Sequence, residues 1–175
     1  MTDTAYGKVL VFDSGMGGLT VARELRALAP SVSVDYAADS GFFPYGDKSD
    51  DALRSRLPQV AKALCAQAQP DVFVIACNTA STLALDAVRE VLDIPVVGTV
   101  PAIKPAAKLT RTGTIGLLAT PGTVRRAYTA QLIADFAQDV SVLMYGSVEL
   151  VQMAEQIAAG EAVSLEAFRA AQAPL

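Results

Sequence analysis

Short apolar runs that alternate with amphipathic stretches constrain the fold of these 175 residues more than any other feature. The stretch 19–28 is typical of the helical segments, because Leu19, Ala22, Leu25 and Leu28 recur at helical spacing. Strands that alternate with helices predict right-handed βαβ units on parallel sheets, so the predicted fold class is α/β. The predicted strands are residues 8–12, 32–37, 71–76, 94–97, 114–118 and 140–145.

The helical pattern also indicates where the chain divides. Further helices are predicted at residues 49–69, 79–92, 101–109, 124–136 and 148–159, with a last one capped by Ser164. Pro58 predicts a kink or a break in the first of these. The pattern restarts with the helix at 101–109, and the segment from Gly98 to Pro105, which contains glycine and proline, is the predicted boundary between two sets of βαβ units. We therefore expect an N-terminal α/β domain over residues 1–98 and a partial second α/β domain over residues 99–175.

The composition argues against several classes of function. A net charge of −4 with scattered basic residues argues against a nucleic-acid partner. No apolar run has membrane-spanning length and the N-terminus lacks a signal-peptide segment, so we expect no membrane partner and a cytoplasmic location. Histidine is absent, which removes most zinc sites, Ser-His-Asp triads and Cys-His dyads. Any catalysis must then use other side chains, such as those of cysteine, aspartate, glutamate, lysine and tyrosine, or backbone groups.

Ligands of open α/β sheets bind just beyond the carboxyl ends of the strands. This rule selects four loops, which are Asp13 to Gly18, Asp39 to Gly46, Cys77 to Thr79 and Thr120 to Thr123. Functional side chains are expected in these loops.

Cys77 is the strongest candidate for a reactive group. It lies at the exit of a predicted strand and immediately before a predicted helix, where backbone N–H groups and the helix dipole favour a thiolate and a lowered pKa. Asn78 and Thr79 follow with short side chains suited to a carboxylate or an amino group. The alternative is a buried structural cysteine. Cys65 lies within a predicted helix and is interpreted as core.

Polar residues in the other loops allow two interpretations each. After the first strand, Asp13 is suited to orienting a substrate amine and Ser14 to binding a carboxylate, or both form a capped turn. Tyr45 could cover a ligand or belong to a rigid turn. Thr120 and Thr123 flank a helix start that is either an anion site or a simple N-cap.

The glycines after the first strand also suggest a nucleotide site. Gly15, Gly17 and Thr20 have the spacing of a dinucleotide fingerprint, with Asp35 or Asp39 as the ribose ligand, but a threonine replaces the third glycine. This hypothesis ranks last, and the absence of a Gly-Lys-Ser/Thr sequence excludes a P-loop.

Together, five ordered motifs resemble glutamate racemases, members of the aspartate/glutamate racemase superfamily. The segment at 11–21 (Val-Phe-Asp-Ser-Gly-Met-Gly-Gly-Leu-Thr-Val) is similar to the opening motif of that family, and 43–49 to its Pro-Tyr-Gly loop. The segment at 76–81 (Ala-Cys-Asn-Thr-Ala-Ser) resembles its first catalytic-cysteine motif, and 97–102 and 120–123 match in order and spacing. The resemblance runs from about Lys8 to the last residue.

The resemblance implies an isomerase that interconverts L- and D-glutamate without a cofactor or metal, for peptidoglycan synthesis, cell-wall biogenesis and cell shape. Two cysteines act on opposite faces of the substrate α-carbon. By position, Cys77 is the acid/base for one enantiomer, Asp13 assists it, and Glu155 is the second assisting carboxylate. The implied glutamate-binding residues are Ser14, Tyr45, Gly46, Asn78 and Thr79, with Thr120 and Thr123 adding contacts. A homodimer is implied, and a cell-wall precursor activates some members.

The second cysteine motif of that family, Gly-Cys-Thr-His, is expected a dozen or so residues beyond Leu175. The implied architecture is therefore two similar parallel-sheet domains with the site in the cleft between them, the second domain and the closing segment of the first being incomplete. We expect a truncated form with little activity. The alternatives are a non-catalytic glutamate-binding or regulatory fragment and a one-cysteine relative such as a decarboxylase, although the cysteine of those relatives lies in the second half.

Overall fold

The computed structural model describes residues 7–172, which form two compact units that divide between Thr99 and Val100. The α/β class and the parallel sheets are confirmed, and each predicted strand appears with its ends within two residues of the prediction. The elements of the first unit are β1 (Lys8–Asp13), α1 (Leu19–Leu28), β2 (Ser33–Ala38), η1 (Ser40–Phe42), η2 (Tyr45–Asp47), α2 (Asp50–Ala68), β3 (Val72–Ile75), α3 (Asn78–Arg89) and β4 (Val96–Gly98).

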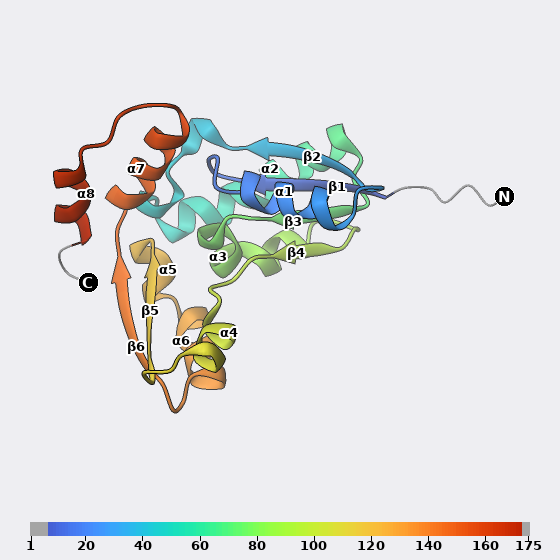
Figure 1. Ribbon diagram of the computed structural model, residues 1–175. Helices are drawn as coiled ribbons and strands as arrows, with labels where there is room; N and C mark the ends of the chain where they lie inside the picture. Colours follow the sequence, from blue (N-terminus) through green and yellow to red (C-terminus); the bar gives the residue numbers. More distant parts are fainter. Residues whose placement is uncertain (1–6, 173–175) are drawn as a thin grey trace. The chain divides into compact units, whose positions relative to one another are not determined.

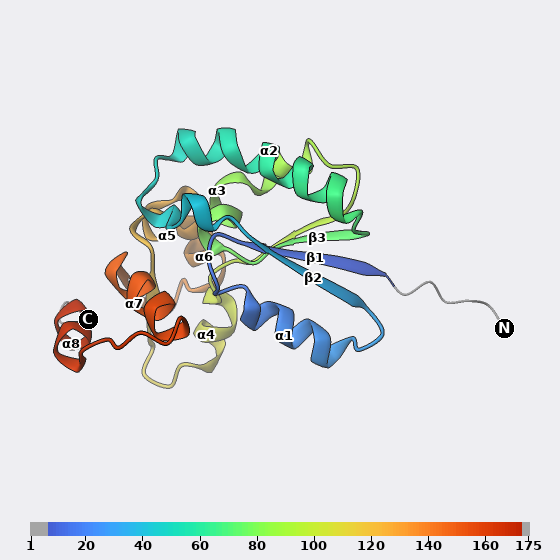
Figure 2. The same ribbon diagram turned by 90° about the horizontal axis from the view of Figure 1, so that it is seen from above.

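Within the described residues, the strands of the first unit form one parallel sheet in the order β2-β1-β3-β4. The helix α1 covers one face of this sheet, and α2 and α3 cover the other (Figures 1 and 2). Because all four strands run in the same direction, the residues that follow β1, β2, β3 and β4 meet at one edge. The two central strands β1 and β3 therefore bring Asp13 and Cys77 to the middle of that edge.

Two apolar layers hold the sheet between its helices. On the α2 and α3 side, Phe12 stacks on Phe73 with ring centroids 5.8 Å apart, and Leu53 and Leu57 of α2 are buried against them. On the α1 side, Ala22 packs against Val11 and its neighbours. Strands buried on both faces are expected to be nearly continuous apolar runs, as β1 and β3 are.

Pro58 does not break its helix. The helix α2 is continuous from Asp50 to Ala68, with Ser49 as the N-cap whose hydroxyl accepts a hydrogen bond from the Ala52 N–H. Of the predicted kink or break, the break is therefore wrong, because the buried residues Leu53, Leu57 and Ala61 bind α2 to the core on both sides of the proline. The kink stays a prediction.

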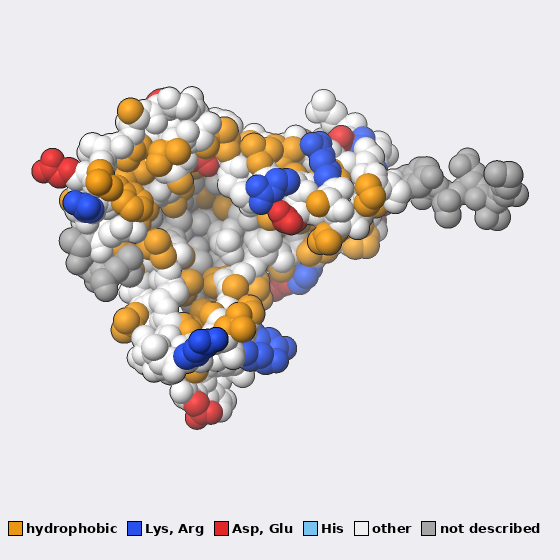
Figure 3. All heavy atoms as spheres, viewed as in Figure 1, with side chains coloured by type: hydrophobic (Ala, Val, Ile, Leu, Met, Phe, Trp, Pro, Cys, Tyr) orange, Lys and Arg blue, Asp and Glu red, His pale blue; other side chains and the backbone are white. Residues whose placement is uncertain are grey.

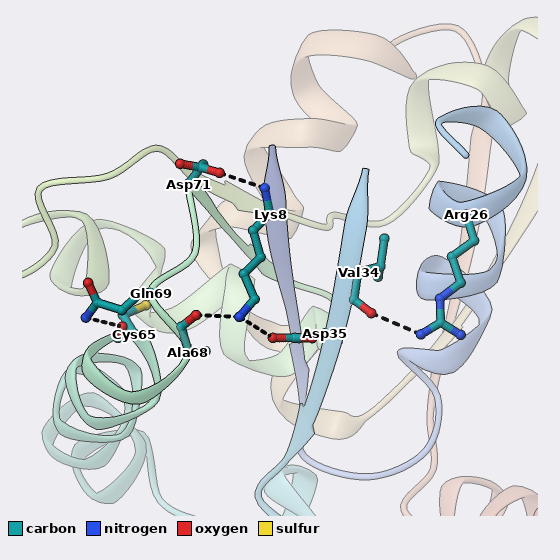
Figure 4. A network of polar contacts seen from close by, with 8 residues as sticks. All are labelled: Lys8, Arg26, Val34, Asp35, Cys65, Ala68, Gln69 and Asp71. Carbon is teal, nitrogen blue, oxygen red and sulfur yellow. Dashed lines mark hydrogen bonds and ion pairs between the residues drawn. The ribbon is translucent and has the colours of Figure 1, made fainter. Parts of the chain in front are cut away.

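Polar contacts tie the helix α2 to the amino end of the sheet (Figure 4). The Lys8 ammonium donates to the Ala68 carbonyl at 2.6 Å, in the last turn of α2, and pairs with Asp35 of β2 at 2.9 Å. The Lys8 N–H donates to the Asp71 carboxylate. This lysine therefore joins three elements at the end of the sheet opposite Cys77.

The second unit contains a smaller parallel pair of strands. Its elements are α4 (Ile103–Leu109), β5 (Thr114–Ala119), α5 (Pro121–Arg125), α6 (Ala127–Phe136), β6 (Ser141–Gly146), α7 (Glu149–Ala158) and α8 (Leu165–Gln172). The single helix predicted over 124–136 was wrong, because Arg126 has extended backbone (φ −72°, ψ 144°) that separates α5 from α6. Ser164 does accept from the Ala167 N–H, as predicted for the cap of α8.

The core of the second unit is small. Ile103, Ile115 and Ala137 form its buried centre, while Leu118, Leu143 and Met144 of the strands are about half exposed. Hydrophobic side chains accordingly appear at the surface of this unit (Figure 3). No helix within residues 7–172 is long and apolar enough to cross a membrane.

Gly113 and Gly116 provide a matched test of the backbone before and within β5. Gly113 has φ +70°, which disfavours any residue with a Cβ, whereas a Cβ at Gly116 meets no atom within 4 Å. We expect Gly113→Ala to lower the free energy of unfolding by about 1 kcal/mol. Gly116→Ala is expected to leave it unchanged or slightly raised in urea titrations followed by circular dichroism. Equal effects of the two substitutions would contradict the assigned conformation.

Candidate active site

The register between β1 and β3 places Ser14 beside Cys77. Phe12 of β1 pairs with Ile75 of β3, and the Ala76 N–H continues the ladder by donating to the Phe12 carbonyl at 2.8 Å. Two residues beyond that pair, Ser14 and Cys77 face each other, and Ser14 Oγ lies 3.6 Å from Cys77 Sγ. Both side chains are buried.

The Asp13 carboxylate organises the turn that carries Ser14. One of its oxygens, Oδ1, accepts hydrogen bonds from the N–H groups of Ser14 and Gly15 and lies 3.3 Å from Ser14 Oγ. The capped turn that the sequence allowed at Asp13 and Ser14 is therefore present. The same hydrogen bonds complete a polar path from Cys77 Sγ through Ser14 Oγ to Asp13 Oδ1.

Gly18 permits the close packing of this turn. A Cβ at Gly18 would lie 2.9 Å from the Asp13 Cβ and 3.0 Å from the Ala76 Cβ. The Tyr36 hydroxyl donates to the Gly15 carbonyl at 2.6 Å and holds the opposite side of the turn. Any side chain at Gly18 would displace Asp13, so this glycine is needed for contact rather than for an unusual backbone angle.

The expectation of a lowered pKa for Cys77 was wrong. Burial, and to a smaller extent the negative charge of Asp13, raise the pKa of the Cys77 thiol from its ordinary value of 9.0 to about 11. Hydrogen bonds from the Ala80 N–H and from Ser14 lower the pKa of Cys77, but by less. The N-terminus of α3 is therefore outweighed by desolvation of the thiolate, and the resting group is a thiol.

The Asp39 to Gly46 loop is fixed by an ion pair that the sequence did not reveal. Arg56 of α2 binds both carboxylate oxygens of Asp39, at 2.6 and 2.7 Å, and the Tyr45 hydroxyl donates to Asp39 at 2.6 Å. The Arg56 guanidinium also lies 4.7 Å from the ring centroid of Phe42. These contacts keep the pKa of Asp39 below its ordinary value, chiefly through the hydrogen bonds from Arg56.

Tyr45 lies inside the core rather than over a cavity. Its side chain is 1% exposed, and burial together with the bond to Asp39 raises the pKa of Tyr45. Gly46, the next residue, is half-buried and lies in the same short turn, η2. A ligand at this loop would therefore meet backbone groups, because the tyrosine hydroxyl is engaged with Asp39.

Asn78 and Thr79 begin α3 directly after Cys77. Asn78 is exposed and Thr79 is buried, so the two adjacent residues point to different environments. Two further hydroxyl groups, those of Ser81 and Thr99, bond to the backbone of residues 75–76 and were not predicted. The sequence signal for Ser81 is its position one helical turn after Cys77.

In the second unit, Thr120 caps α5. Its hydroxyl accepts from the Thr123 N–H and lies 3.0 Å from the Thr123 hydroxyl, which is the N-cap interpretation of the sequence. Glu155 is half-buried on α7 rather than fully solvated.

The nucleotide hypothesis gains no support from the acidic residues it requires. Asp39 is engaged with Arg56 and Tyr45, and Asp35 pairs with Lys8 at the opposite end of the sheet (Figure 4). Among the described residues, no group of three or more cysteine and acidic side chains is arranged to hold a metal ion.

The environment of Cys77 gives a signed prediction. In a Cys65→Ala background, the rate at which iodoacetamide alkylates Cys77 should rise with pH, and the midpoint of this rise should lie near pH 11. Asp13→Asn should lower that midpoint by about one pH unit, because it removes a negative charge beside the thiolate. Ser14→Ala should raise it, because it removes a donor to the thiolate. Shifts in the same direction for both variants would contradict this account.

The Asp39–Arg56 pair predicts a change in acid stability. Since the pKa of Asp39 is lower in the folded state, its contribution is present above about pH 4 and is lost as pH falls through the folded pKa. With Asp39→Asn or Arg56→Met, the free energy of unfolding measured in urea titrations should fall less steeply at acid pH. The double variant should resemble either single variant, with a coupling free energy of about 1 kcal/mol. Strict additivity would argue against the pair.

Comparison with known proteins places this geometry in a family. The sequence is 52% identical over 161 residues to a glutamate racemase of Escherichia coli O139:H28 (strain E24377A / ETEC), covering 92% of this chain and 56% of that protein. It is 53% identical over 157 residues to a glutamate racemase of Pectobacterium carotovorum subsp. carotovorum (strain PC1), covering 90% of this chain and 55% of that protein. The chain thus spans a little over half the length of these curated relatives.

Solved structures agree with the sequence comparison. The crystal structure of Escherichia coli glutamate racemase in complex with L-glutamate and the activator UDP-MurNAc-ala matches with a TM-score of 0.91 and 50% identity, over 97% of this chain and 64% of that one. Glutamate racemase isoform RacE1 from Bacillus anthracis matches with a TM-score of 0.78 and 31% identity, over 96% and 63% of the two chains. The family described as Asp/Glu/Hydantoin racemase matches residues 19–175. This chain therefore belongs to the Asp/Glu/Hydantoin racemase family.

Proposed function

We propose that this chain carries one catalytic face of a cofactor-independent glutamate racemase. The observation that carries the proposal is the path from Cys77 Sγ to Ser14 Oγ at 3.6 Å and on to Asp13 Oδ1 at 3.3 Å. It is a chain of groups able to move a proton, located at the ligand-binding edge of a parallel sheet. The glutamate racemases that match this chain support the choice of reaction.

In the proposed reaction, Cys77 starts as a thiol. Its proton moves toward Ser14, whose own hydroxyl proton moves toward the Asp13 carboxylate. The thiolate then takes the α-proton of glutamate, so that an S–H bond forms as the C–H bond breaks. Burial, the largest cause of the raised pKa of Cys77, suits this step, because the α-proton is very weakly acidic and a poorly solvated thiolate is a stronger base than an ordinary one.

Glutamate would bind at the first turn of α3. Its carboxylates are anions, and the free N–H groups at a helix N-terminus are anion donors. Asn78 offers an exposed amide side chain there, and Thr79 and Ser14 offer hydroxyl groups. Gly46 would contribute through its backbone, as would Tyr45, whose hydroxyl is bonded to Asp39. We propose Thr120, Thr123 and Glu155 as contributors from the second unit.

Inversion needs a second acid/base group on the opposite face of the α-carbon, because a single base restores the original hand. Cys65 does not fill that role, since it lies within α2 and packs against the core beside Leu64 and Ala68. We therefore propose that these 175 residues, on their own, exchange the α-proton of one enantiomer with little racemisation.

The relatives also suggest partners. The Escherichia coli structure holds L-glutamate and the activator UDP-MurNAc-ala. By analogy we propose a cell-wall precursor as activator, a homodimeric assembly, a cytoplasmic location and a role in supplying D-glutamate for peptidoglycan.

The direct test is α-proton exchange of L- and D-glutamate in heavy water, followed by proton NMR. We expect the 175-residue chain to exchange one enantiomer without inversion, because the Cys77 thiol exchanges with solvent and returns deuterium to the same face. Cys77→Ser should abolish the exchange, and the matched control Cys65→Ser should retain it.

The alternatives give different outcomes in the same experiment. Binding of glutamate by calorimetry without exchange would favour a non-catalytic glutamate-binding module. Release of carbon dioxide from a dicarboxylate would favour a decarboxylase. Exchange that survives Cys77→Ser would overturn the assigned role of this cysteine.

A further inference from the structure

Two buried or half-buried hydroxyl groups converge on the backbone just before Cys77. Ser81 lies one turn into α3, and Thr99 follows β4 as the last residue of the first unit. Neither residue belongs to the path from Cys77 through Ser14 to Asp13. Their contacts show what they do.

Ser81 and Thr99 bind the same short segment. The Ser81 hydroxyl donates to the Ile75 carbonyl at 3.0 Å and accepts from the Thr99 N–H at 3.1 Å. The Thr99 hydroxyl lies 2.9 Å from the Ala76 carbonyl and 3.2 Å from that of Ile75. The two side chains and the end of β3 thus form one hydrogen-bonded cluster.

This cluster completes the support around Cys77. On one side, the Ala76 N–H is bound to the Phe12 carbonyl of β1, and on the other the Ala76 carbonyl is bound to Thr99. The Cys77 carbonyl accepts from the Ser81 N–H at 2.9 Å. The residue before Cys77 is therefore held by β1 on one side and by the residue that follows β4 on the other, and Cys77 itself is held by its helix.

The cluster is tightly packed. Ser81 is 4% exposed, and a Cβ at Gly98 would lie 3.2 Å from its hydroxyl oxygen and 2.9 Å from Leu85. If one hydroxyl were removed, its partners would lose a hydrogen bond in a buried place, and the strand exit would relax to recover it.

We propose that Ser81 and Thr99 are positioning residues that aim the Cys77 thiol at Ser14, a role that rests on the proposed function of Cys77. The contact between Cys77 Sγ and Ser14 Oγ spans 3.6 Å, within the range of hydrogen bonds that involve sulfur. A shift of the strand exit by about 1 Å would break it. The position of Thr99, where the chain leaves the first unit, would thereby affect the position of the Cys77 thiol.

The test is a set of double-mutant cycles on the iodoacetamide rate of Cys77, in the full 175-residue chain with Cys65→Ala. Alone, Ser14→Ala should slow alkylation about tenfold at a pH of about 8, because the thiolate loses a donor. In the Ser81→Ala and Thr99→Val backgrounds this Ser14 effect should vanish, because the contact is already broken. Thr99→Ser, which keeps the hydroxyl, should retain the full effect.

Thr129→Val is the control, since it removes a threonine hydroxyl that is fully buried in the second unit and donates to the Thr123 carbonyl at 2.6 Å. It should leave the Ser14 effect intact, which separates positioning from general destabilisation. A Ser14 effect that persists in both Ser81→Ala and Thr99→Val, or that is absent from the parent chain, would overturn the proposal. If Ser81→Ala does not fold, the comparison of Thr99→Val with Thr99→Ser decides. Because glutamate is not used, failure of α-proton exchange would count against the proposed function alone.

Discussion

The parallel pairing of β1 with β3 is the constraint on which the candidate site depends. It fixes the register in which the residues after the two strands face each other, and it thereby brings Ser14 to Cys77 across 63 positions of sequence. A change of register by one residue would turn one of these side chains toward the opposite face of the sheet. The apolar layers on both faces make such a change costly, because β1 and β3 are buried on each side. The hydrophobic packing of the first unit thus also determines how Ser14 and Cys77 lie relative to each other.

Burial and charge act on Cys77 in the same direction. Desolvation and Asp13 both disfavour the thiolate, while the donors from α3 and Ser14 favour it less strongly. The site therefore holds a neutral thiol beside a carboxylate that is a candidate to take its proton. This arrangement differs from that of a nucleophilic cysteine, where a low pKa keeps the thiolate populated. It suits proton transfer to and from carbon, where the strength of the base matters more than the fraction of thiolate present at rest.

The sequence predicted much of the backbone and less of the side-chain chemistry. Strands were found because buried parallel strands are short apolar runs, and the loops at their carboxyl ends followed from topology. The sign of the Cys77 pKa shift was wrong, because position at a helix start is visible in sequence whereas the depth of burial is not. Pro58 shows the same limit, since burial on both sides of the proline keeps the helix continuous. The pair of Asp39 with Arg56 escaped prediction because 17 residues separate its members and no local pattern joins them.

The burial of the Cys77 thiol also affects how readily this cysteine is oxidised. Peroxide and disulfides react with thiolates, and their attack requires access as well as charge. Cys77 is 8% exposed and mostly protonated at neutral pH, and burial also raises the pKa of the half-buried Cys65. The Cys77 sulfur is thereby shielded from oxidants, and the raised pKa of Cys65 slows the reaction of that cysteine with them. The burial that raises the pKa of Cys77 thus also favours its reduced form.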